Sequence, residues 1–439
     1  MKRLLIRNGR IIDPVRGHDR PGSLLVAGGK IVPGDDFLPG PEDTVIDAAG
    51  LVVCPGFIDL HCHLRQPGFE AKETIATGTR AAARGGFTTV CGMPNTSPPL
   101  DSPEIIERVK AIAAAEGAVR VLPIGCVSRN RAGKEPADMA ALARAGAVAF
   151  SDDGSPVADD GLMRRALVSS RTLGRPVIDH CEDMRLSRDG QVNEGATARQ
   201  LGLRGIPAAA EENMVRRDLA LAVEVPDCQL HIAHVSTADA AALIKEAKAR
   251  GVPVTAEVTP HHLTLTEAAV LAAGTMAKVN PPLRTERDTA ALLAALREGV
   301  IDAIATDHAP HTTADKPEDF TRAAFGISGL ETALGSLMGL VHEGKLDLMT
   351  LIAKLTAGPA KILHRKDLGT LAAGAAADIT IFDPEMEWTV DVSRFASQGK
   401  NTPLAGKKLR GRVLATIYGG EIIYLDESLK STKILAGKK

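Results

Sequence analysis

This sequence has few aromatic residues, a net charge close to zero and no long apolar run. Phe, Tyr and Trp make up 3% of the 439 residues, and 52 basic residues nearly balance 54 acidic ones, for a formal net charge of −2. Binding to nucleic acid requires a basic surface that neutralises phosphates, and a membrane-spanning helix requires about 20 consecutive apolar residues. The sequence has neither feature, so we expect no nucleic-acid partner and no membrane-spanning segment.

Cysteine is also sparse and shows no pairing pattern. The six cysteines are dispersed along the chain: Cys54, Cys62, Cys91, Cys126, Cys181 and Cys228. Several lie within apolar, strand-like runs, where a reduced, buried thiol is the usual state. The N-terminal sequence MKRLLIRNGRIID has no long apolar region and no small-residue cleavage site, so it does not have the pattern of a secretion signal. We therefore expect a cytoplasmic protein.

The apolar pattern changes twice along the chain. Residues 1–52 and 368–425 contain short strand-like runs separated by Gly, Pro and Asp, which is typical of β structure. Residues 53–367 alternate apolar β-type runs with amphipathic helical stretches. A chain of 439 residues exceeds what one core usually fills, so we expect a large α/β domain and a small β-sandwich domain formed from both chain ends. Residues 426–439 have no partner pattern, and we expect them to be disordered.

The central region contains eight strand candidates, each followed by a helical stretch. They are residues 56–64, 86–94, 119–127, 147–154, 176–183, 229–236, 252–260 and 302–310. Eight βα units in series predict a closed parallel (β/α)8 barrel of the TIM type. An open, doubly wound sheet is the structural alternative, but no glycine-rich dinucleotide fingerprint follows the first strand.

Metal-ligating residues lie where these predicted strands end. His61 and His63 are two apart on the first strand, so both imidazoles can face one centre. Later strands end in further candidates: Asp152, Asp153, His180, His234, Asp307 and His308. In a (β/α)8 barrel the active site forms at the C-terminal ends of the strands. Imidazole and carboxylate ligands together suit zinc or a similar divalent ion, and two metals sharing a bridging carboxylate fit this number of ligands.

Each of these residues also has a plain structural interpretation. Residues 152–154 read Asp-Asp-Gly, which favours a turn, and Asp307 could cap a helix. His231 lies three positions before His234 and faces the opposite side of its strand, so we expect a role in the core or behind the ligands. His261 and His262 are expected at the rim or behind the ligands. A single H-x-H is a weak signal, but H-x-H followed by further ligand types at the ends of later strands is a strong one.

Motifs along nearly the whole chain resemble one known family. The stretch PGFIDLHCHLRQPG (55–68) resembles the opening of the amidohydrolase superfamily, and its Arg65 resembles the dihydroorotase form. Further matches follow in the same order: GMPNT (92–96), FSDDG (150–154), IDHCED (178–183), HIAHVS (231–236), KVNPPLR (278–284), ATDHAPH (305–311), FGISGLE (325–331) and LGTLAAGAAADITIFD (368–383). The sequence is thus similar to the bacterial dihydroorotase subgroup in which Asp bridges the metals.

This resemblance implies a ligand set, a substrate and a reaction. It places His61 and His63 on one metal, His180 and His234 on the other, Asp153 as the bridge, and Asp307 as both ligand and catalytic base. It implies one or two Zn²⁺ ions and these substrate contacts: Arg65, Asn95, Asn280, His311, Phe325 and Gly326. The implied reaction is the reversible cyclisation of N-carbamoyl-L-aspartate to L-dihydroorotate in pyrimidine biosynthesis. A metal-activated hydroxide would attack the ring carbonyl, with Asp307 as general base and then acid.

The residue chemistry agrees with a carboxylate-bearing substrate. A guanidinium such as Arg65 can hold a carboxylate through two hydrogen bonds, which a neutral hydantoin would not require. The plain alternative for Arg65 is a salt bridge at the barrel mouth. The amide of Asn95 can bind a carboxylate or ring amide, and its plain alternative is an Asx turn. Gln66 departs from the family, which often has an acidic residue there.

The sequence is compatible with two alternative functions. One alternative is another cyclic amidohydrolase, such as an allantoinase or hydantoinase. Related hydantoinases and dihydropyrimidinases use a carboxylated lysine on the fourth strand, but residues 147–154 contain no lysine. This absence and Arg65 both weigh against the alternative. Some dihydroorotase-like chains are silent partners of aspartate carbamoyltransferase, and these typically lose metal ligands, which this chain retains. Association with that transferase and a homo-oligomeric state are both compatible with the resemblance. Residues 312–326 could form a cover over the site or a plain surface loop.

Overall fold

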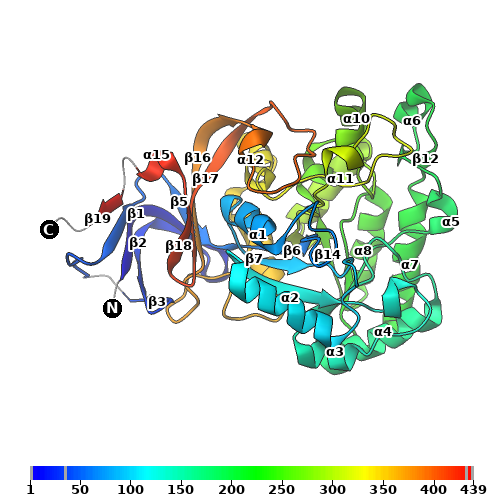
Figure 1. Cartoon of the computed structure of the whole chain (residues 1–439), viewed down its shortest axis with the longest axis horizontal. Helices are drawn as coiled ribbons and strands as arrows, with labels where there is room; N and C mark the ends of the chain where they lie inside the picture. The colour runs from blue at the N-terminus through cyan, green and yellow to red at the C-terminus, as the bar shows by residue number, and fades with distance from the viewer. Residues whose placement is uncertain (1–2, 34–36, 431–433, 437–439) are drawn as a thin grey trace.

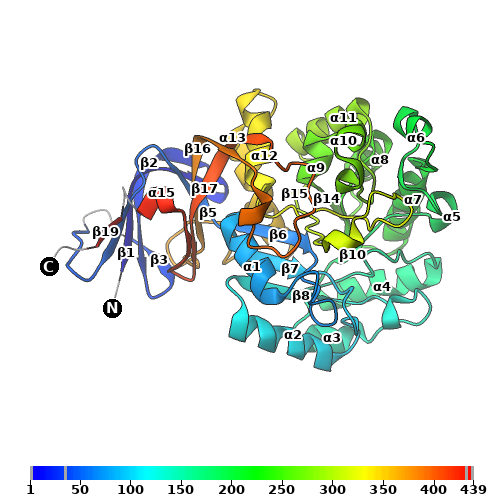
Figure 2. The ribbon, with the colours of Figure 1, turned by 45° about the horizontal axis from the view of Figure 1, so that its top comes forward.

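The computed structural model describes residues 3–33, 37–430 and 434–436. Two parts lie side by side: a large α/β barrel and a smaller β domain (Figures 1 and 2). The chain begins in the β domain, runs through the whole barrel and returns to the β domain. Within the described ranges no helix combines the length and the apolar character that a membrane span requires.

The barrel consists of eight parallel strands in sequential order, as the sequence pattern predicts. The strands are β6 (Phe57–Cys62), β7 (Phe87–Gly92), β8 (Arg120–Gly125), β9 (Ala149–Phe150), β10 (Val177–Asp179), β13 (Leu230–Ile232), β14 (Val254–Val258) and β15 (Ala303–Ile304). Beyond β15, the amide of His63 donates to the carbonyl of His308 over 2.8 Å, which joins the last strand region to the first. The expected (β/α)8 barrel is therefore confirmed, and the open sheet is excluded.

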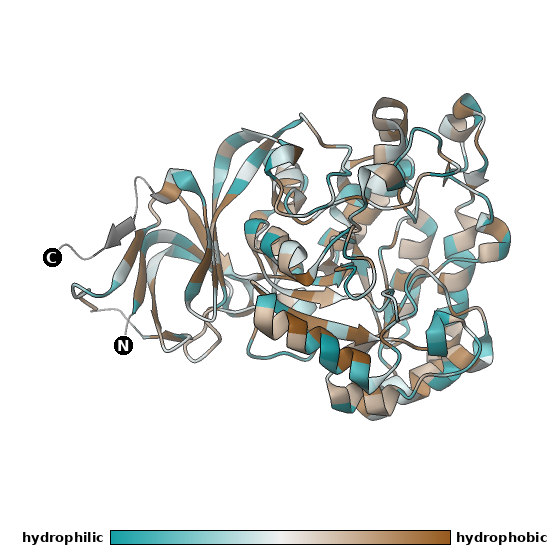
Figure 3. Ribbon diagram, in the orientation of Figure 1, coloured by the Kyte–Doolittle hydropathy of each residue, from teal (hydrophilic) through white to brown (hydrophobic). Residues whose placement is uncertain are grey.

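Helices surround the strands and cover their outer face (Figure 2). The longer ones are α1 (Ile75–Arg84), α2 (Pro103–Glu116), α3 (Met139–Ala145), α4 (Asp160–Leu173), α7 (Ala209–Glu224), α8 (Ala238–Ala249), α11 (Glu286–Arg297), α12 (Ala333–His342) and α13 (Leu348–Leu355). Helix α2 shows why they pack this way: it buries Ile106 and Val109 and exposes charged residues on the opposite face (Figure 3). Shorter helices and strands lie in the connections between these elements: α5 (Met184–Ser187), β11 (Val192–Asn193), α6 (Ala196–Leu201), β12 (Gly205–Ile206), α9 (Pro260–Thr264), α10 (Ala268–Ala273) and α14 (Ala357–Ile362).

The small domain is one sheet of nine strands contributed by both ends of the chain. The strands are β1 (Leu4–Asp13), β2 (His18–Ala27), β3 (Lys30–Val32), β4 (Thr44–Asp47), β5 (Val52–Pro55), β16 (Ile379–Thr389), β17 (Lys408–Tyr418), β18 (Glu421–Leu425) and β19 (Ile434–Ala436). Strand β5 joins the two ends, because it pairs in parallel with β1 and antiparallel with β16. Apolar side chains from both ends, among them Ile6, Val53 and Ile379, form a common core.

The C-terminal tail has more structure than its sequence suggests. Residues Glu427–Lys430 form the short helix α15, and β19 pairs antiparallel with β4. The remaining tail positions, 431–433 and 437–439, lie outside the described residues. A three-residue strand has too little pattern to be recognised in sequence, because its pairing depends on an edge presented by the opposite end of the chain.

Candidate active site

The candidate ligands meet at the C-terminal rim of the barrel. His61 lies in the last part of β6 and His63 directly follows this strand. The other candidate ligands come from the segments after four further strands: Asp153, His180, His234 and Asp307. All six side chains are buried. Parallel strands in a barrel all end at the same rim, so residues far apart in sequence converge there.

Asp153 lies at the centre of the four histidines. Its Oδ1 is 3.3 Å from His61 Nε2, 3.5 Å from His180 Nδ1 and 3.6 Å from His234 Nε2. Its Oδ2 is 3.6 Å from His63 Nε2. One carboxylate thus faces all four imidazoles, which is the position that a residue bridging two cations would occupy.

Asp307 closes the site from the segment after the last strand, β15, which lies next to β6. Its Oδ1 is 3.1 Å from His63 Nε2 and 3.6 Å from His61 Nε2. The backbone of Asp307 has φ of 46°, and His234 and Arg65 also have positive φ, 30° and 61°. Non-glycine residues rarely adopt this conformation, and it is concentrated at functional sites where the surrounding structure enforces it.

The buried polar atoms of this cluster fit a divalent cation. Across the described part of the chain, His61 Nε2, Asp153 Oδ1 and His234 Nδ1 are buried without a hydrogen-bond partner. Such atoms are costly to bury unless a ligand satisfies them. Two groups have ligand atoms within 4.8 Å of one another: His61, His63 and Asp307 form one, and His61, Asp153 and His234 the other. Nitrogen and carboxylate donors in this arrangement suit zinc or a similar ion.

The electrostatics of the cluster agree with this. Burial alone would raise the pKa of Asp153, but His61, His180 and His234 outweigh it and hold that pKa well below its usual range. Burial alone would lower the pKa of His180, but Asp153 and Glu182 raise it to about 10. The carboxylates therefore carry negative charge that protons on His61 and His180, whose pKa values are both raised, balance in the protein alone. A divalent cation can replace those protons, so metal binding would release them.

Glu257 on β14 orients His61 from behind, although it is not among the predicted site residues. Glu257 Oε1 is 2.9 Å from His61 Nδ1, and its Oε2 is 3.1 Å from His231 Nε2. His231 Nδ1 in turn lies 2.8 Å from Thr255 Oγ1. A carboxylate on the far nitrogen of a histidine fixes the tautomer that leaves the other nitrogen free for a metal. The available signal was a charged residue inside the apolar run VTAEV, since such residues are buried only with partners.

Two more candidate ligands, His63 and His180, are also oriented by a neighbouring polar side chain. His63 Nδ1 lies 2.8 Å from Asn95 Oδ1, and His180 Nε2 lies 3.0 Å from Glu182 Oε2. Glu182 also accepts from the amide of Asn280 over 2.9 Å. Asn95 and Asn280, expected as substrate contacts, therefore also hold the ligand histidines in place.

A further cluster with metal-ligand chemistry lies beside His180. It consists of Asp179, Cys181 and Asp218. Arg217 already supplies its positive charge, because its Nε is 2.7 Å from Asp218 Oδ1 and its Nη2 is 3.9 Å from Asp179 Oδ2. We therefore assign it as a buried ion-pair network.

A cavity of about 240 Å³ lies directly above the ligand cluster. Eleven of the twelve predicted site residues line it: His63, Arg65, Asn95, Asp153, His180, His234, Asn280, Asp307, His311, Phe325 and Gly326. The twelfth, His61, is buried next to them. Pockets that bind drug-sized ligands have volumes of roughly 300–1,000 Å³. The cavity therefore suits a small metabolite.

The cationic wall of the cavity is formed by Arg65 and its neighbours. The Arg65 Nε donates to the carbonyl of Pro310 over 3.3 Å, and Nη2 lies 3.3 Å from His311 Nε2. His311 Nε2 is also 2.8 Å from the carbonyl of Phe325, to which it can donate. Burial, followed by the charge of Arg65, lowers the pKa of His311 to about 3, so this ring is neutral at pH 7. Gln66, where the family often has an acidic residue, accepts from the amide of Ile75 at the start of α1 over 2.9 Å.

The segment 312–326 forms one edge of the cavity through Phe325 and Gly326. Lys278 Nζ donates to the carbonyls of Phe320 and Ala323, both over 2.6 Å. Lys316 Nζ donates to the carbonyl of Gly326 over 3.1 Å. Two buried ammonium groups thus hold this segment against the barrel mouth.

The (β/α)8 barrel, its rim of histidines and carboxylates, and the adjacent cationic cavity define a metal-dependent hydrolase of the amidohydrolase class. A family profile described as "Dihydro-orotase-like" matches residues 50–240. A relative from Pelotomaculum thermopropionicum named dihydroorotase is 52% identical over 98% of this chain and 100% of its own length. Another dihydroorotase, from Anaeromyxobacter dehalogenans, is 50% identical over 97% of this chain and 98% of its own. The chain belongs to the dihydroorotase family and is a cyclic amidohydrolase.

Solved structures with the same fold come from hydantoinases. The L-hydantoinase of Arthrobacter aurescens matches with a TM-score of 0.87 at 26% identity, covering 96% of each chain. A D-hydantoinase from a Thermus species matches with a TM-score of 0.82 at 26% identity, covering 96% of this chain and 95% of that one. The similarity supports the barrel and β-domain architecture over nearly the whole chain.

Proposed function

We propose that this chain is a zinc-dependent dihydroorotase that interconverts N-carbamoyl-L-aspartate and L-dihydroorotate. The observation that carries the proposal is the placement of Arg65 and Asn95 on the same small cavity as the ligand cluster. A guanidinium and an amide suit the carboxylate of the substrate, and the ligand cluster lies where its ring carbonyl would react.

One or two zinc ions would be held by His61, His63, Asp153, His180, His234 and Asp307. A bound divalent ion lowers the pKa of water and polarises a carbonyl oxygen. Asp307 is the proposed general base and acid. Burial raises its pKa, but His63 and His61 outweigh this and keep the pKa below its usual range, so it starts as a carboxylate.

In ring opening, Asp307 accepts a proton from the attacking water and delivers it to the ring nitrogen that leaves. In ring closure, the ureido nitrogen attacks the side-chain carboxyl carbon, and Asp307 carries the proton in the other direction. Arg65 holds the substrate carboxylate. Asn95 uses its oxygen to accept from His63, so its amino group remains available to the substrate.

A hydantoinase-type activity is the second candidate, because the solved structures of the same fold are hydantoinases. Asp153 occupies the centre of the four histidines, and residues 147–154 contain no lysine that could be carboxylated there. Arg65 in the cavity also favours a substrate with a carboxylate. Dihydroorotate is therefore the better match.

We also propose a cytoplasmic location, supported by six free, buried cysteines, which suit a reducing compartment. Association with aspartate carbamoyltransferase and a homo-oligomeric state are proposals that rest on family resemblance. The complete ligand set favours an active enzyme over a silent partner.

The decisive experiment follows the interconversion of dihydroorotate and N-carbamoyl-aspartate by the purified zinc-loaded chain. The assay is run with and without aspartate carbamoyltransferase, and bound metal is counted on the same sample. Activity of the chain alone supports an autonomous enzyme, and activity only with the transferase supports a partner-dependent one. A metal-loaded chain that is inactive on dihydroorotate in both conditions but opens hydantoin or allantoin would overturn the proposal.

Replacement of the proposed base tests the mechanism. Asp307→Asn should lower kcat by about 10²–10⁴-fold, the usual contribution of general acid–base catalysis. Metal content is measured on the same protein, since Asp307 is also a proposed ligand. An Asp307→Asn protein with normal metal content and full activity contradicts the assignment.

A further inference from the structure

The connection between β16 and β17, residues 390–407, reaches from the β domain to the barrel mouth (Figures 1 and 2). Its base is closed by backbone hydrogen bonds from Val390 to Lys407 (2.9 Å) and from Gly406 to Val390 (2.8 Å). It is therefore a closed loop whose two ends lie together and whose tip extends away from the small sheet. We call residues 390–407 the strap.

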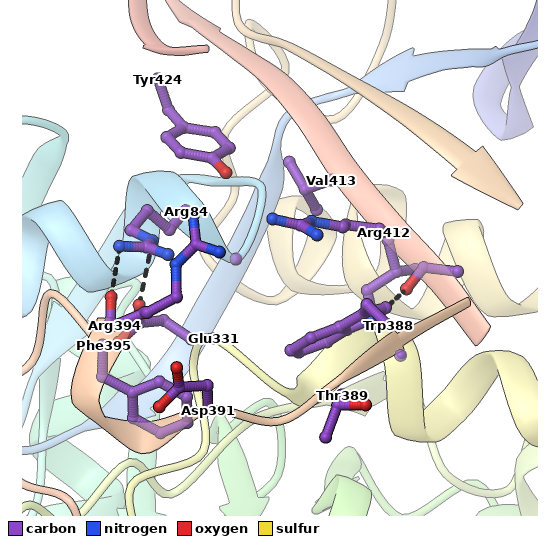
Figure 4. A pocket seen from close by; sticks show the side chains of 14 residues that line it. Arg84, Glu331, Trp388, Thr389, Asp391, Arg394, Phe395, Arg412, Val413 and Tyr424 are labelled. Atoms are coloured by element: carbon purple, nitrogen blue, oxygen red, sulfur yellow. Dashed lines mark hydrogen bonds and ion pairs between the residues drawn. The ribbon is translucent and has the colours of Figure 1, made fainter. Parts of the chain in front are cut away.

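The outer part of the strap is anchored to the barrel helices (Figure 4). Arg84 of α1 donates to the carbonyl of Arg394, and its Nε is 3.2 Å from Glu331. Glu331 also accepts from the backbone amides of Ala396 (2.9 Å) and Ser397 (3.2 Å). A cavity of about 300 Å³ lies on this side of the strap. Arg84 and Glu331 are thus used to hold the strap.

Residues 397–399 of the strap contact the segments that flank the candidate ligands. Ser397 Oγ donates to Glu73 over 2.5 Å, and Glu73 also faces His308 Nε2 at 3.3 Å. His308 is the residue after Asp307. Gly399 packs so closely that an added Cβ would lie 2.5 Å from Pro310 Cβ. Any larger residue at this position would push the strap away from the barrel.

Asn401, a few residues further along the strap, lies between two segments of the barrel rim. Asn401 Oδ1 accepts from the amide of His311 and the hydroxyl of Ser328, each over 3.0 Å. Its Nδ2 donates to the carbonyls of Ala309 and Gly326, also each over 3.0 Å. An amide side chain has two donor and two acceptor positions, and all four are used here. Asn401 is 3% exposed.

These bonds fix one wall of the substrate cavity from behind. His311 and Gly326 line the cavity, whereas Asn401 does not. The carbonyl of Gly326 accepts from both Asn401 and Lys316, and its amide donates to the carbonyl of Lys278 over 2.9 Å. The wall is therefore held in place by residues outside the cavity, one of which comes from the small domain.

We propose that Asn401 is a positioning residue for substrate binding, and that the small β domain thereby completes the active site. Asn401 joins the segments 309–311 and 326–328, so that His311 and Gly326 stand at the spacing the substrate needs. The choice of residue follows from its four bonds: Asp keeps the two acceptor bonds but loses both donors, and Ala loses all four. The substrate role rests on the proposed function, whereas the holding of the wall does not.

The test compares Asn401→Ala and Asn401→Asp with the unmodified zinc-loaded chain. We expect KM for dihydroorotate to rise about tenfold in Asn401→Ala, because losing contacts of ordinary hydrogen-bond strength has roughly that effect on affinity. The value of kcat and the metal content should change little, since Asn401 touches neither the ligands nor the reacting atoms. A purely structural residue would instead lower the active fraction and leave KM unchanged. Asn401→Asp, which keeps the shape of the side chain, provides the same test if the Ala protein does not fold.

Asn193→Ala is the matched control, because Asn193 is also buried and bonded to Arg284 and Glu267 but does not line the cavity. It should lower Tm without changing KM. Hydrogen exchange gives a readout without activity: amides in residues 305–330 should exchange faster in Asn401→Ala than in Asn193→Ala. Unchanged KM together with unchanged exchange overturns the inference. If the unmodified chain has no dihydroorotase activity, the proposed function fails, and exchange alone decides whether Asn401 holds the wall.

Discussion

At the scale of single residues, His61 depends on a carboxylate that never reaches the cavity. Glu257 is fully buried, and it contacts both His61 and His231. Burial alone would raise its pKa, but the two imidazoles outweigh this and lower it to about 2, so Glu257 stays charged. A charged acceptor makes the histidine a more basic metal ligand and fixes its orientation.

Glu257→Gln should therefore weaken zinc binding by about 10–100-fold, the usual effect of losing a supporting partner. The amide keeps the shape of the side chain but not its charge. Zinc affinity is measured by competition with a chromophoric chelator. Asp13→Asn serves as control, because Asp13 is a buried carboxylate in the β domain that accepts from Thr370 and Leu371. Equal zinc affinities of the Glu257→Gln protein and the control would contradict this role.

At the scale of elements, strand β1 makes hydrogen-bonded pairs with three other strands of the small domain. It pairs antiparallel with β2 and in parallel with both β4 and β5. Just before β1 and β4 begin, Arg3 and Asp43 form a two-pronged ion pair with distances of 3.1 and 2.9 Å. Asp43 also accepts from the amide of Gly40 over 2.7 Å. This pair fixes the register at which the two strands start.

The ion pair predicts a specific dependence of stability on pH. The hydrogen bond from Arg3, followed by that from Gly40, lowers the pKa of Asp43 from 3.8 to about 2. Because the folded-state pKa is the lower one, the stabilisation is present above pH 3.8 and is lost as pH falls to about 2. Asp43→Asn should lower Tm at neutral pH, and the difference from the unmodified chain should shrink over that interval. A difference in Tm that is constant down to pH 2 would show that the charge of Asp43 is not responsible.

At the scale of the whole molecule, the ligand cluster connects strands from the entire barrel. The ligands follow β6, β9, β10, β13 and β15, so a cation there would link the first strand to the last. Asp153 and Asp307 lie buried among imidazoles, and in the described chain Asp153 Oδ1, His61 Nε2 and His234 Nδ1 have no hydrogen-bond partner. Binding of metal to the folded state alone stabilises that state.

Removal of metal with a chelator should lower Tm, and zinc should restore it. At a free zinc concentration about 100 times Kd, the expected stabilisation is about 2.7 kcal/mol. Differential scanning calorimetry of the stripped and reloaded protein measures this effect. Magnesium, which prefers oxygen ligands, is the control and should restore much less. Identical Tm values with and without zinc would mean that the cluster does not bind it in the folded protein.

The barrel and the convergence of the candidate metal ligands at one rim follow from sequence pattern. The alternation of apolar runs and amphipathic helices is a local property, and it predicts all eight strands of the barrel. The ligand positions follow from period-two alternation and from the rule that barrel strands end at a common rim, which brings His61 and Asp307 together over 246 positions (307 minus 61). The domain limits and the chemical roles of the site residues remain predictions.

The residues that support the site became apparent from contacts between distant segments. Glu257 meets His61 across the barrel, and Asn401 meets His311 across the boundary between the two domains. Such contacts cannot be recognised from a local sequence pattern. A hydrogen bond needs only one suitable partner, and that partner can lie anywhere along the chain. The same reason applies to β19, whose pairing depends on an edge formed near the other end of the chain. Local periodicity sets the elements, whereas the packing of distant segments sets the orientation of each functional side chain.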